Sequence, residues 1–473
     1  MKKHAACLLG LLAFALYFFT GSRTIQWQDS GQFTLRIGTG ELMNYWGLAM
    51  VHPLHYHLGR IAMRLMPWNI PWAITSVSAL GGAVAVGGAF AAVHKWTRNF
   101  NAALYAALCL MMAHTFWRFS GLPEVYTLSA ALLILQMLCY LHIQKDGKPG
   151  AWIPLMGLNG LNFANHNLAL LELAVWGLLF LHAWRKGALS HRQAFAAIGL
   201  WLLGSLPYTS LILVTMFVQG AFWPVVQSAL FGHSFSEQVM AVRPTLIYTF
   251  VSLAFLALSF PNLSLPFAGL AAWRERKALA PLLAVLAMHL IFVLRYDVID
   301  QYTFLIPAMA GLAFFAGIGF NQCQKPVFRR LAFCLLALQP LLYGIAPTLA
   351  RQTDLLGTLG FERNKPYRDD AEYLFWPWTF RETSASQIAR DAVEAAHPDG
   401  GIVIVDHMAS YAVLWTLHTW ENPHEIKVLR PGDQEELLDI LTANKRAVWM
   451  PASTVDEIPE GWTPNGKVLI NLP

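Results

Sequence analysis

The chain has 473 residues, of which 56% are hydrophobic and only 13% are charged. Soluble domains carry about 25% charged residues, so this composition excludes a soluble globular protein and places most of the chain in a membrane. The formal net charge of +5 gives no reason to expect nucleic acid as a partner.

The first apolar segment is "CLLGLLAFALYFFTG", residues 7–21, which follows two lysines. A basic start and an apolar core are also features of signal peptides. Because further apolar segments follow along the whole chain, we expect this one to remain as the first transmembrane helix. A carboxylate, Asp29, comes shortly after it.

Apolar windows long enough to span about 30 Å of hydrocarbon recur down the chain. The window 74–93 contains two glycine pairs, Gly81–Gly82 and Gly87–Gly88, which favour close packing between helices. The other windows are 101–118, 123–143, 151–164, 166–184, 194–216, 245–260, 279–294, 303–320 and 330–349. With the N-terminal helix they predict about eleven transmembrane helices in a domain that covers residues 1–350.

Lysine and arginine fall in alternate loops between these windows. The positive-inside rule places those loops and the N-terminus in the cytoplasm. The basic residues are Lys2, Lys3, Lys95, Arg98, Lys145, Lys148, Arg185, Lys186, Arg192, Arg274, Arg276, Lys277, Lys325, Arg329 and Arg330. The loops 22–72, 119–123, near 165, 217–244, 295–302 and everything after about residue 350 should face outward. We expect an integral protein of the inner or plasma membrane.

The composition changes near Arg351, and residues 351–473 predict a small extracytoplasmic α/β domain of about 120 residues. Strands are expected at 401–406, 425–429 and 446–451, with a helix at 410–420. A second helix is expected at 432–444, where Asp433 is a capping residue and an apolar stripe follows. This domain should lack the catalytic base and help to select an acceptor or brace the membrane part.

Unusual polar residues collect in the loops that should face outward. They are Asp29, Gln32, His52, His55, His57, Arg60, Glu124, Tyr126, Asn165, His166, Arg295, Asp297 and Asp300. Charged groups at the membrane are costly and mark functional sites. Their convergence on one face predicts a single polar cavity at the outer interface.

Each of these residues also has a structural interpretation. Asp29 could cap a short helix, because "DSGQ" has the pattern of a capping box. Glu124 follows a proline and suits the first turn of a helix, and Asn165–His166 could form a turn. The arginine and aspartates of 295–300 could be a surface cluster.

A metal site is a further possibility for the histidines of "HPLHYH". Their spacings of three and two residues differ from the paired i, i+4 arrangement of helical zinc ligands, which argues against a metal. The five cysteines lie in or beside apolar windows and give neither a disulfide framework nor a CxxC pattern.

Taken in order, these motifs resemble the GT-C superfamily of polytopic glycosyltransferases, and more narrowly its protein O-mannosyltransferase-like branch. The matching segments are "DSGQF" (29–33), "HPLHYHLGR" (52–60), "EVYTLSAALLI" (124–134), "GLNFANH" (160–166), "DQYTFLIPA" (300–308) and, in the tail, "GGIVIVDHMASYAVLWTL" (400–417). The sequence departs from the family pattern at Gln32, where Glu is usual, and where histidines replace a Pro/Gly-rich turn. The expected fold is therefore an α-helical polytopic membrane protein with a small soluble α/β domain.

The resemblance implies a donor in which a monosaccharide, such as mannose, is linked to polyprenyl phosphate. It implies transfer to an acceptor hydroxyl, most simply a protein Ser or Thr, with inversion. Asp29 is the expected catalytic base, because a positioned carboxylate can take the hydroxyl proton. Membrane lipids and a protein or glycan acceptor are the expected partners, with no cofactor and no metal.

The remaining residues are expected to bind substrate. Arg60 and Arg295 should contact the leaving phosphate, helped by protonated His52 or His55. Asn165 and His166 should bind the sugar or the phosphate, with Asp300 also at the substrate. Glu124 and Tyr126 should orient the acceptor or Asp29, and Gln32 keeps a hydrogen-bonding group without a charge.

Three alternatives stay open at the level of sequence. The acceptor could be a lipid or a surface polysaccharide instead of a protein. The chain could transport lipid-linked sugars, although such transporters carry internal symmetry and polar groups near the bilayer midplane, and neither is detected. A zinc-dependent membrane hydrolase that uses His52, His55 and His57 is the third.

Overall fold

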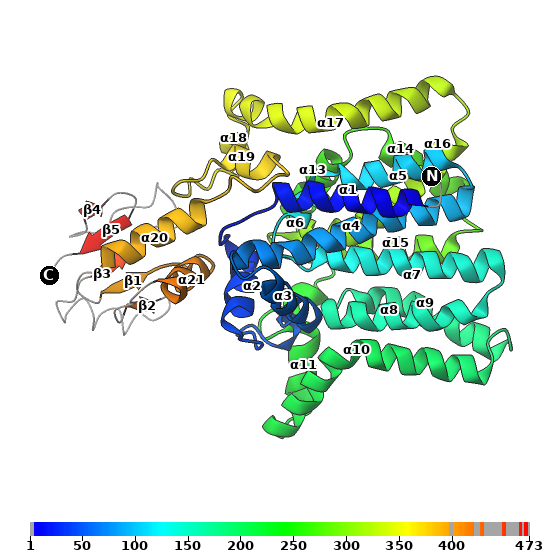
Figure 1. Cartoon of the computed structure of the whole chain (residues 1–473), viewed down its shortest axis with the longest axis horizontal. Coiled ribbons are helices and arrows are strands. Elements are labelled where there is room, and N and C mark those ends of the chain that lie inside the picture. The colour runs from blue at the N-terminus through cyan, green and yellow to red at the C-terminus, as the bar shows by residue number, and fades with distance from the viewer. Residues whose placement is uncertain are drawn as a thin grey trace.

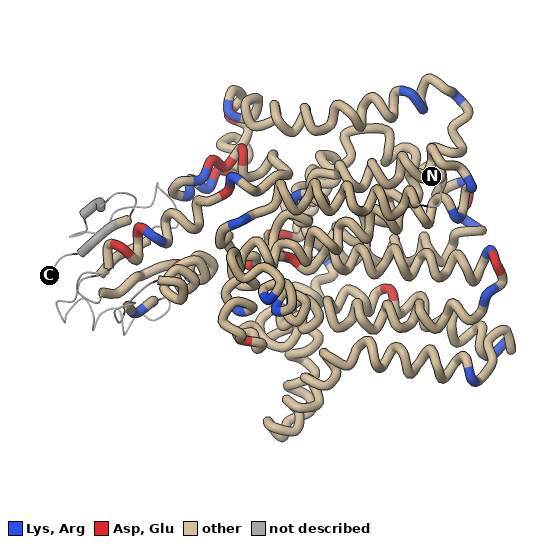
Figure 2. Tube along the Cα trace, in the orientation of Figure 1, with Lys and Arg blue, Asp and Glu red and all other residues tan. Residues whose placement is uncertain are grey.

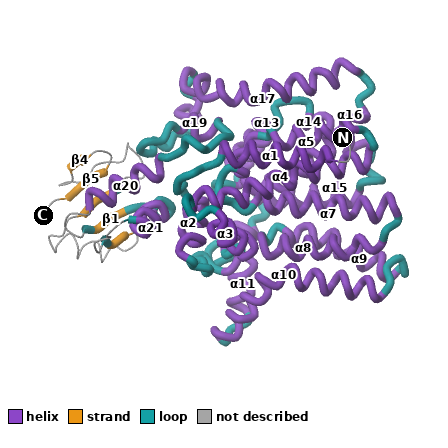
Figure 3. Tube along the Cα trace, in the orientation of Figure 1, coloured by secondary structure: helices purple, strands orange, loops and turns teal. Residues whose placement is uncertain are grey.

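The protein is a helical bundle with a small sheet at one end (Figure 1). The structure is a computed structural model, and it describes residues 4–396, 401–420, 426–429, 447–450, 463–465 and 468–471. Most long helices run side by side, whereas the strands gather at the end that carries the C-terminus (Figure 3).

Every apolar window of the sequence is helical. The bundle is made of α1 (Ala5–Thr20), α4 (Ile70–Thr97), α5 (Phe100–Met111), α6 (His114–Ser120), α7 (Tyr126–Asp146), α8 (Trp152–Asn165), α9 (Ala169–Arg185), α10 (His191–Gln219), α13 (Leu246–Ser259), α14 (Ser264–Arg274), α15 (Ala280–Arg295), α16 (Ile306–Gln322) and α17 (Pro326–Gln352). A 3-10 turn, η3 (Pro149–Ala151), precedes α8. This is the architecture of an integral membrane protein.

The predicted number of eleven spans is not confirmed. Within the described residues, 5 helices are long and apolar enough to cross a membrane, or up to 7 if the bent pairs α5–α6 and α13–α14 each count as one span. These pairs bend by 65° and 100°. Helices such as α8, with 14 residues, reach only about 21 Å and fall short of the hydrocarbon thickness.

Glycine lets α4 pack directly against its neighbours, as the sequence predicts. A Cβ on Gly81 would lie 2.7 Å from the backbone nitrogen of Leu128 in α7. A Cβ on Gly87 would lie 2.8 Å from the carbonyl oxygen of Ala6 in α1. Any larger residue at these positions would push the helices apart.

A polar network lies inside the bundle, where the sequence analysis detected none. Glu172 of α9 is fully buried. Its carboxylate accepts hydrogen bonds from Nδ2 of Asn162 at 2.9 Å and from Nε2 of Gln136 at 2.7 Å. Nε2 of His289 in α15 lies 3.4 Å from the same carboxylate. These residues come from four separate apolar windows, so only the packing of α7, α8, α9 and α15 reveals that they meet.

Short helices cover the end of the bundle that faces the sheet. They are α2 (Gln28–Thr39), η2 (Leu48–Met50), α3 (Pro53–Leu65), α11 (Trp223–Phe231), α12 (Ser236–Met240), η4 (Gln301–Leu305), α18 (Leu355–Leu359) and α19 (Asp370–Phe375). The predicted outer loops 22–72 and 217–244 are therefore largely helical. The opposite end of the bundle carries most of the Lys and Arg of the inter-helix loops (Figure 2).

The C-terminal part contains α20 (Ser384–Ala396), β1 (Ile402–Ile404), α21 (Ser410–Thr419), β2 (Lys427–Leu429), β3 (Ala447–Trp449), β4 (Thr463–Asn465) and β5 (Val468–Asn471). The strand order is β2-β1-β3-β5-β4. β1 pairs in parallel with β2 and β3, while β5 pairs antiparallel with β3 and β4. The first three strands and α21 coincide with predicted elements, and the predicted helix 432–444 lies outside the described residues.

The segment just before Asp29 is built into this C-terminal part. Ile25 and Trp27 belong to the same buried cluster as Val393 and Val403. Nε1 of Trp27 donates to Oγ of Ser384 at 2.8 Å. The C-terminal elements therefore hold the start of α2. The predicted domain boundary at 350/351 falls in the last turn of α17 and stays a prediction.

Candidate functional site

A cavity of about 580 Å³ lies at the end of the bundle next to the C-terminal part. Its walls come from α2, the α6–α7 corner, the α8–α9 turn, α11 to α13, and the loop between α15 and η4. The predicted residues that line it are Asp29, Gln32, His52, Glu124, Tyr126, His166, Asp297 and Asp300. Segments far apart in sequence thus meet at one cavity, as the sequence predicts.

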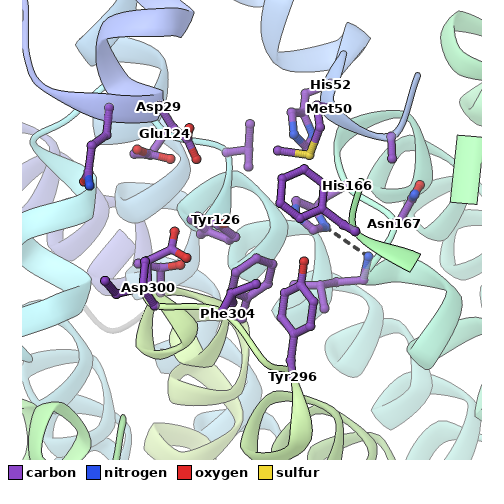
Figure 4. Close-up of a pocket in the computed structure, with 18 of the residues that line it drawn as sticks. Asp29, Met50, His52, Glu124, Tyr126, His166, Asn167, Tyr296, Asp300 and Phe304 are labelled. Carbon is purple, nitrogen blue, oxygen red and sulfur yellow. Dashed lines mark hydrogen bonds between the residues drawn. The ribbon is translucent and has the colours of Figure 1, made fainter. Parts of the chain in front are cut away.

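The acidic residues gather on one side of the cavity. In Figure 4, Asp29 and Glu124 lie close together, Asp300 lies on the same side, and His52, His166 and Asn167 lie on the other. Ser30, which follows Asp29 in α2, donates from Oγ to Oε1 of Glu124 at 2.7 Å. The first turn of α2 is thereby tied to the start of α7.

Burial and mutual repulsion keep these carboxyl groups from all being ionised. Burial, followed by the charge of Asp300, raises the pKa of Asp29 to about 7. Burial also raises the pKa of Asp300. For Glu124, burial and then the charge of Asp29 raise the pKa well above its ordinary value. Burial therefore favours the protonated form of Glu124, whereas Asp29, with a pKa of about 7, is partly ionised near neutral pH.

Asp29 lies in the first turn of α2 but is not its capping residue. The N-cap position is Trp27, and no side chain caps it. The interpretation of Asp29 as a helix cap is therefore wrong. Its side chain is surrounded by protein and remains partly accessible.

Two residues of the cavity wall have strained backbones. Gln28 has φ of 57° and His52 has φ of 52°, both in the left-handed region that residues other than glycine rarely adopt. Such strain costs about 1–3 kcal/mol and clusters at functional sites. Here the two strained residues are the one that precedes Asp29 and the first histidine of "HPLHYH".

The histidines of the cavity form a neutral pair. The rings of His52 and His166 stack with centroids 5.0 Å apart. Nδ1 of His52 is hydrogen-bonded with the carbonyl oxygen of Asn165 at 2.8 Å. Burial lowers the pKa of His52 to about 4, so it carries no charge near neutral pH. The expectation of a protonated His52 at the phosphate therefore fails.

Gln32 joins the membrane part to the C-terminal part. Its Nε2 donates to the hydroxyl of Tyr411 in α21 at 2.7 Å. Its Oε1 accepts from Nδ2 of Asn44 at 2.9 Å. The side chain is thus held at both ends in the wall of the cavity, one turn after Asp29.

Tyr126 belongs to a group of aromatic rings that lies between the acidic side and the histidine side of the cavity. Its ring lies 5.1 Å from that of Phe304 and 5.4 Å from that of His166. Tyr296 packs on Phe304 at 4.8 Å. In Figure 4, the rings of Tyr126 and Phe304 lie below Asp29 and Glu124, and Phe304 lies between Asp300 and Tyr296.

Five of the residues predicted to converge here do not line the cavity, and one of them, His57 of α3, is exposed. Arg60 donates to the carbonyl oxygen of Ile37 at 2.9 Å, and Arg295 donates to those of Val239 and Ala241 at 2.7 Å. Neither guanidinium group lines the cavity, so neither is placed to meet a phosphate there.

The other two are His55 and Asn165. His55 is fully buried against Phe33, with ring centroids 5.0 Å apart, and burial lowers its pKa to about 3. Asn165 donates from Nδ2 to the carbonyl oxygen of Val125 and to Oγ of Ser129. It therefore holds the α8–α9 turn against α7, as the structural interpretation of a turn residue suggested.

Sequence reasoning missed Arg118, which is the only Lys or Arg lining the cavity among the described residues. It lies in α6, donates to the carbonyl oxygen of Trp376 at 3.1 Å, and stacks over the ring of Tyr373 at 4.4 Å. A lone arginine in the apolar stretch "HTFWRFS" was the available signal. Trp46 and Phe235 are further lining residues outside any motif, and Met408 lies in the tail segment 400–417, for which no cavity residue was predicted.

Metal binding finds no support in the side-chain arrangement. Within the part of the chain that the structure describes, no group of three or more His, Cys, Asp and Glu could hold a metal ion. The absence of a metal and of a cofactor stays a prediction.

The comparisons with known proteins agree with this architecture. Residues 47–189 match the family model described as the N-terminal domain of the protein O-mannosyl-transferase TMEM260. No curated protein sequence matches the chain. The matched residues contribute His52, Glu124, Tyr126 and His166 to the cavity.

Solved structures of ArnT from Cupriavidus metallidurans share the fold. Apo ArnT superposes with a TM-score of 0.64 at 13% identity, covering 99% of this chain and 98% of ArnT. ArnT bound to undecaprenyl phosphate gives a TM-score of 0.63 at 14% identity, covering 98% of this chain and 97% of ArnT. The fold shared along nearly the whole chain and the family match over residues 47–189 agree with the resemblance to GT-C glycosyltransferases that the sequence motifs carry.

Proposed function

We propose that the protein transfers a monosaccharide from a polyprenyl-phosphate-linked donor to the hydroxyl of a protein Ser or Thr, with inversion. The observation that carries this proposal is the cavity itself, which pairs a cluster of carboxyl groups with an apolar wall. Leu230, Phe231 and Phe292 belong to that wall, from α11 and α15. A lipid-linked sugar needs both kinds of surface.

The proposed chemistry is a displacement at the anomeric carbon. The acceptor oxygen forms a bond to that carbon while the bond to the phosphate oxygen breaks, and polyprenyl phosphate leaves. The hydroxyl proton passes to the ionised Asp29. Attack opposite the leaving phosphate inverts the anomeric centre.

The residues around Asp29 are consistent with its proposed role as the base. A protonated Glu124 reduces the negative charge that would repel a phosphate, and it leaves Asp29 as the available base. Arg118 is the cation in the wall and is assigned to the leaving phosphate, in place of Arg60 and Arg295. His52 and His166, as neutral rings, are assigned to the sugar.

Two comparisons support the choice of donor and acceptor. An ArnT structure is bound to undecaprenyl phosphate, and the matched family model is that of a protein O-mannosyl-transferase. Mannose is therefore the first sugar to test.

Mass spectrometry of outer proteins and glycolipids, with and without this protein, tests the proposal. Loss of a hexose from Ser or Thr is the expected result. A change confined to glycolipids would assign the enzyme to a lipid or polysaccharide acceptor instead. An unchanged pattern in both, with normal abundance of the protein in controls, would contradict the transferase function.

A further inference from the structure

One part of the cavity wall includes a residue of the C-terminal elements and has a distinct chemistry. Met408, from the turn before α21, lines the cavity together with Trp46 and Phe235. The rings of Trp46 and Phe235 lie 6.0 Å apart. We call these three residues the Met408 wall.

Aromatic and hydrogen-bonded contacts fix the residues that flank Met408 to the membrane part. The ring of His407 lies 4.9 Å from that of Trp46, edge to face. The hydroxyl of Tyr411 accepts from Gln32 and is hydrogen-bonded with Nε2 of His407 at 3.2 Å. The position of Met408 is thereby coupled to α2.

Close packing of α21 on α2 reinforces the coupling. A Cβ on Gly38 of α2 would lie only 2.3 Å from the ring of Trp415 in α21, so glycine is required for this approach. Asp29 and Gln32, three residues apart in α2, lie on the same helical face. The Met408 wall and the proposed base thus line one cavity, and α21 is fixed to the helix that carries Asp29.

Charge and position separate this wall from the donor. It contains no Lys or Arg to pair with a phosphate. Met408 comes from the C-terminal elements beside the end of the bundle (Figure 1), and Trp46 and Phe235 come from the short segments at that end. The apolar residues of α11 and α15 lie on bundle elements, where a lipid chain would lie. The Met408 wall thus faces a neutral substrate that arrives from outside the membrane.

The wall suits a peptide better than a glycan. Its surface is a thioether and two aromatic rings, and the nearby amide of Gln32 is already paired at both ends. A glycan presents many hydroxyl groups, which require hydrogen-bonding partners. A methionine adapts to side chains of different shape, as flanking residues of a peptide would require.

We infer that the Met408 wall is the subsite for the peptide residues that flank the acceptor Ser or Thr. This inference rests on the proposed transferase function and extends it. It means that the C-terminal part contacts the acceptor directly.

The test uses the full-length protein in liposomes with polyprenyl-phosphate mannose and Ser/Thr peptides that differ in the flanking residues. Two rates are measured, transfer to peptide and release of mannose to water without acceptor. Met408→Ala should raise the KM for peptide about tenfold or more, because apolar contacts of this size discriminate to that extent. Release to water should be unchanged, and Met408→Leu, which keeps the volume, should restore the KM.

Met43→Ala is the matched control, since Met43 is in the outer segment between α2 and η2, is 45% exposed and does not line the cavity. A fall in release to water equal to the fall in transfer would overturn the inference, as would a KM change limited to glycan acceptors. If the unmodified protein neither transfers nor releases mannose, or any other sugar, from such donors, the proposed function itself fails. That result is distinct from a failure of the subsite.

Discussion

Asp29 is the residue on which the proposed mechanism depends most directly. Asp29→Asn keeps the size of the side chain and removes the proton acceptor. General-base catalysis contributes about 10²–10⁴ in rate, so turnover should fall by at least that factor. The measurement is the rate of sugar transfer at matched protein abundance in liposomes.

The control for this substitution is donor binding, which should survive in Asp29→Asn because Arg118 and the apolar wall are intact. Near-normal transfer would remove Asp29 from the mechanism and point to Glu124. Loss of both transfer and binding would instead indicate a structural role for Asp29 at the start of α2.

The pH dependence of turnover should report the state of Asp29. Its carboxyl must be ionised to act, and its pKa is raised to about 7, so the rate should rise with pH through neutrality and level off above it. At pH 6 the ionised fraction, and with it the rate, should be lower than the plateau by about tenfold.

Asp300→Asn provides a sharper form of the same prediction. The charge of Asp300 helps to raise the pKa of Asp29, so its removal should move the rise in rate to lower pH. The measurement is kcat against pH for both proteins. A rise that stays at the same pH in Asp300→Asn would show that another group controls it.

At the scale of elements, the buried network around Glu172 should stabilise the contact of α7, α8, α9 and α15. Glu172→Ala leaves buried amide donors unpaired and should lower the free energy of unfolding by about 3–5 kcal/mol. Thermal unfolding in a fixed detergent is the measurement.

Glu172→Gln should cost much less, about 1 kcal/mol. Oδ1 of Asn162 is buried without a hydrogen-bond partner among the described residues, so it can accept from the new amide after a small rotation. Equal losses in both variants would mean that the volume of the side chain, and not its hydrogen bonding, holds these helices together.

The elements also show what the sequence could predict. Asp29, Glu124 and Asp300 each follow an apolar window or a helix-starting proline, and such positions place them at one end of the bundle regardless of packing detail. The roles of Arg60 and Arg295 could not be predicted in this way. An arginine near a helix end can face a cavity or pair with backbone carbonyls, and only tertiary packing decides which.

The contribution of the C-terminal elements to the cavity could not be predicted from the sequence either. Met408 lines the cavity, and Tyr411 accepts a hydrogen bond from Gln32 of its wall, because α21 packs on α2 across a glycine. Nothing in the local pattern of "DHMASYAVLW" indicates that contact. The bent pairs change the count of spans. The break between α5 and α6 falls inside the predicted window 101–118, whereas α14 lies outside the predicted windows.

At the scale of the whole molecule, the two ends of the bundle differ in a way that predicts orientation. The cavity lies at the end next to the C-terminal strands, and the basic inter-helix loops gather at the other (Figure 2). Loops rich in Lys and Arg remain in the cytoplasm during insertion. The cavity and the C-terminal part should therefore face the opposite compartment, where lipid-linked sugars and secreted acceptors would meet.

A pair of reporter fusions tests this orientation. A reporter that is active only in the cytoplasm should be inactive when fused after Pro473 and active when inserted after Gly147. Gly147 lies in the basic loop between α7 and α8, and a Cβ there would meet nothing within 4 Å, so an insertion should be tolerated. Activity after Pro473, or the same activity at both positions, would contradict the predicted topology. A cavity that faced the cytoplasm would also remove the reason to expect a secreted peptide at the Met408 wall.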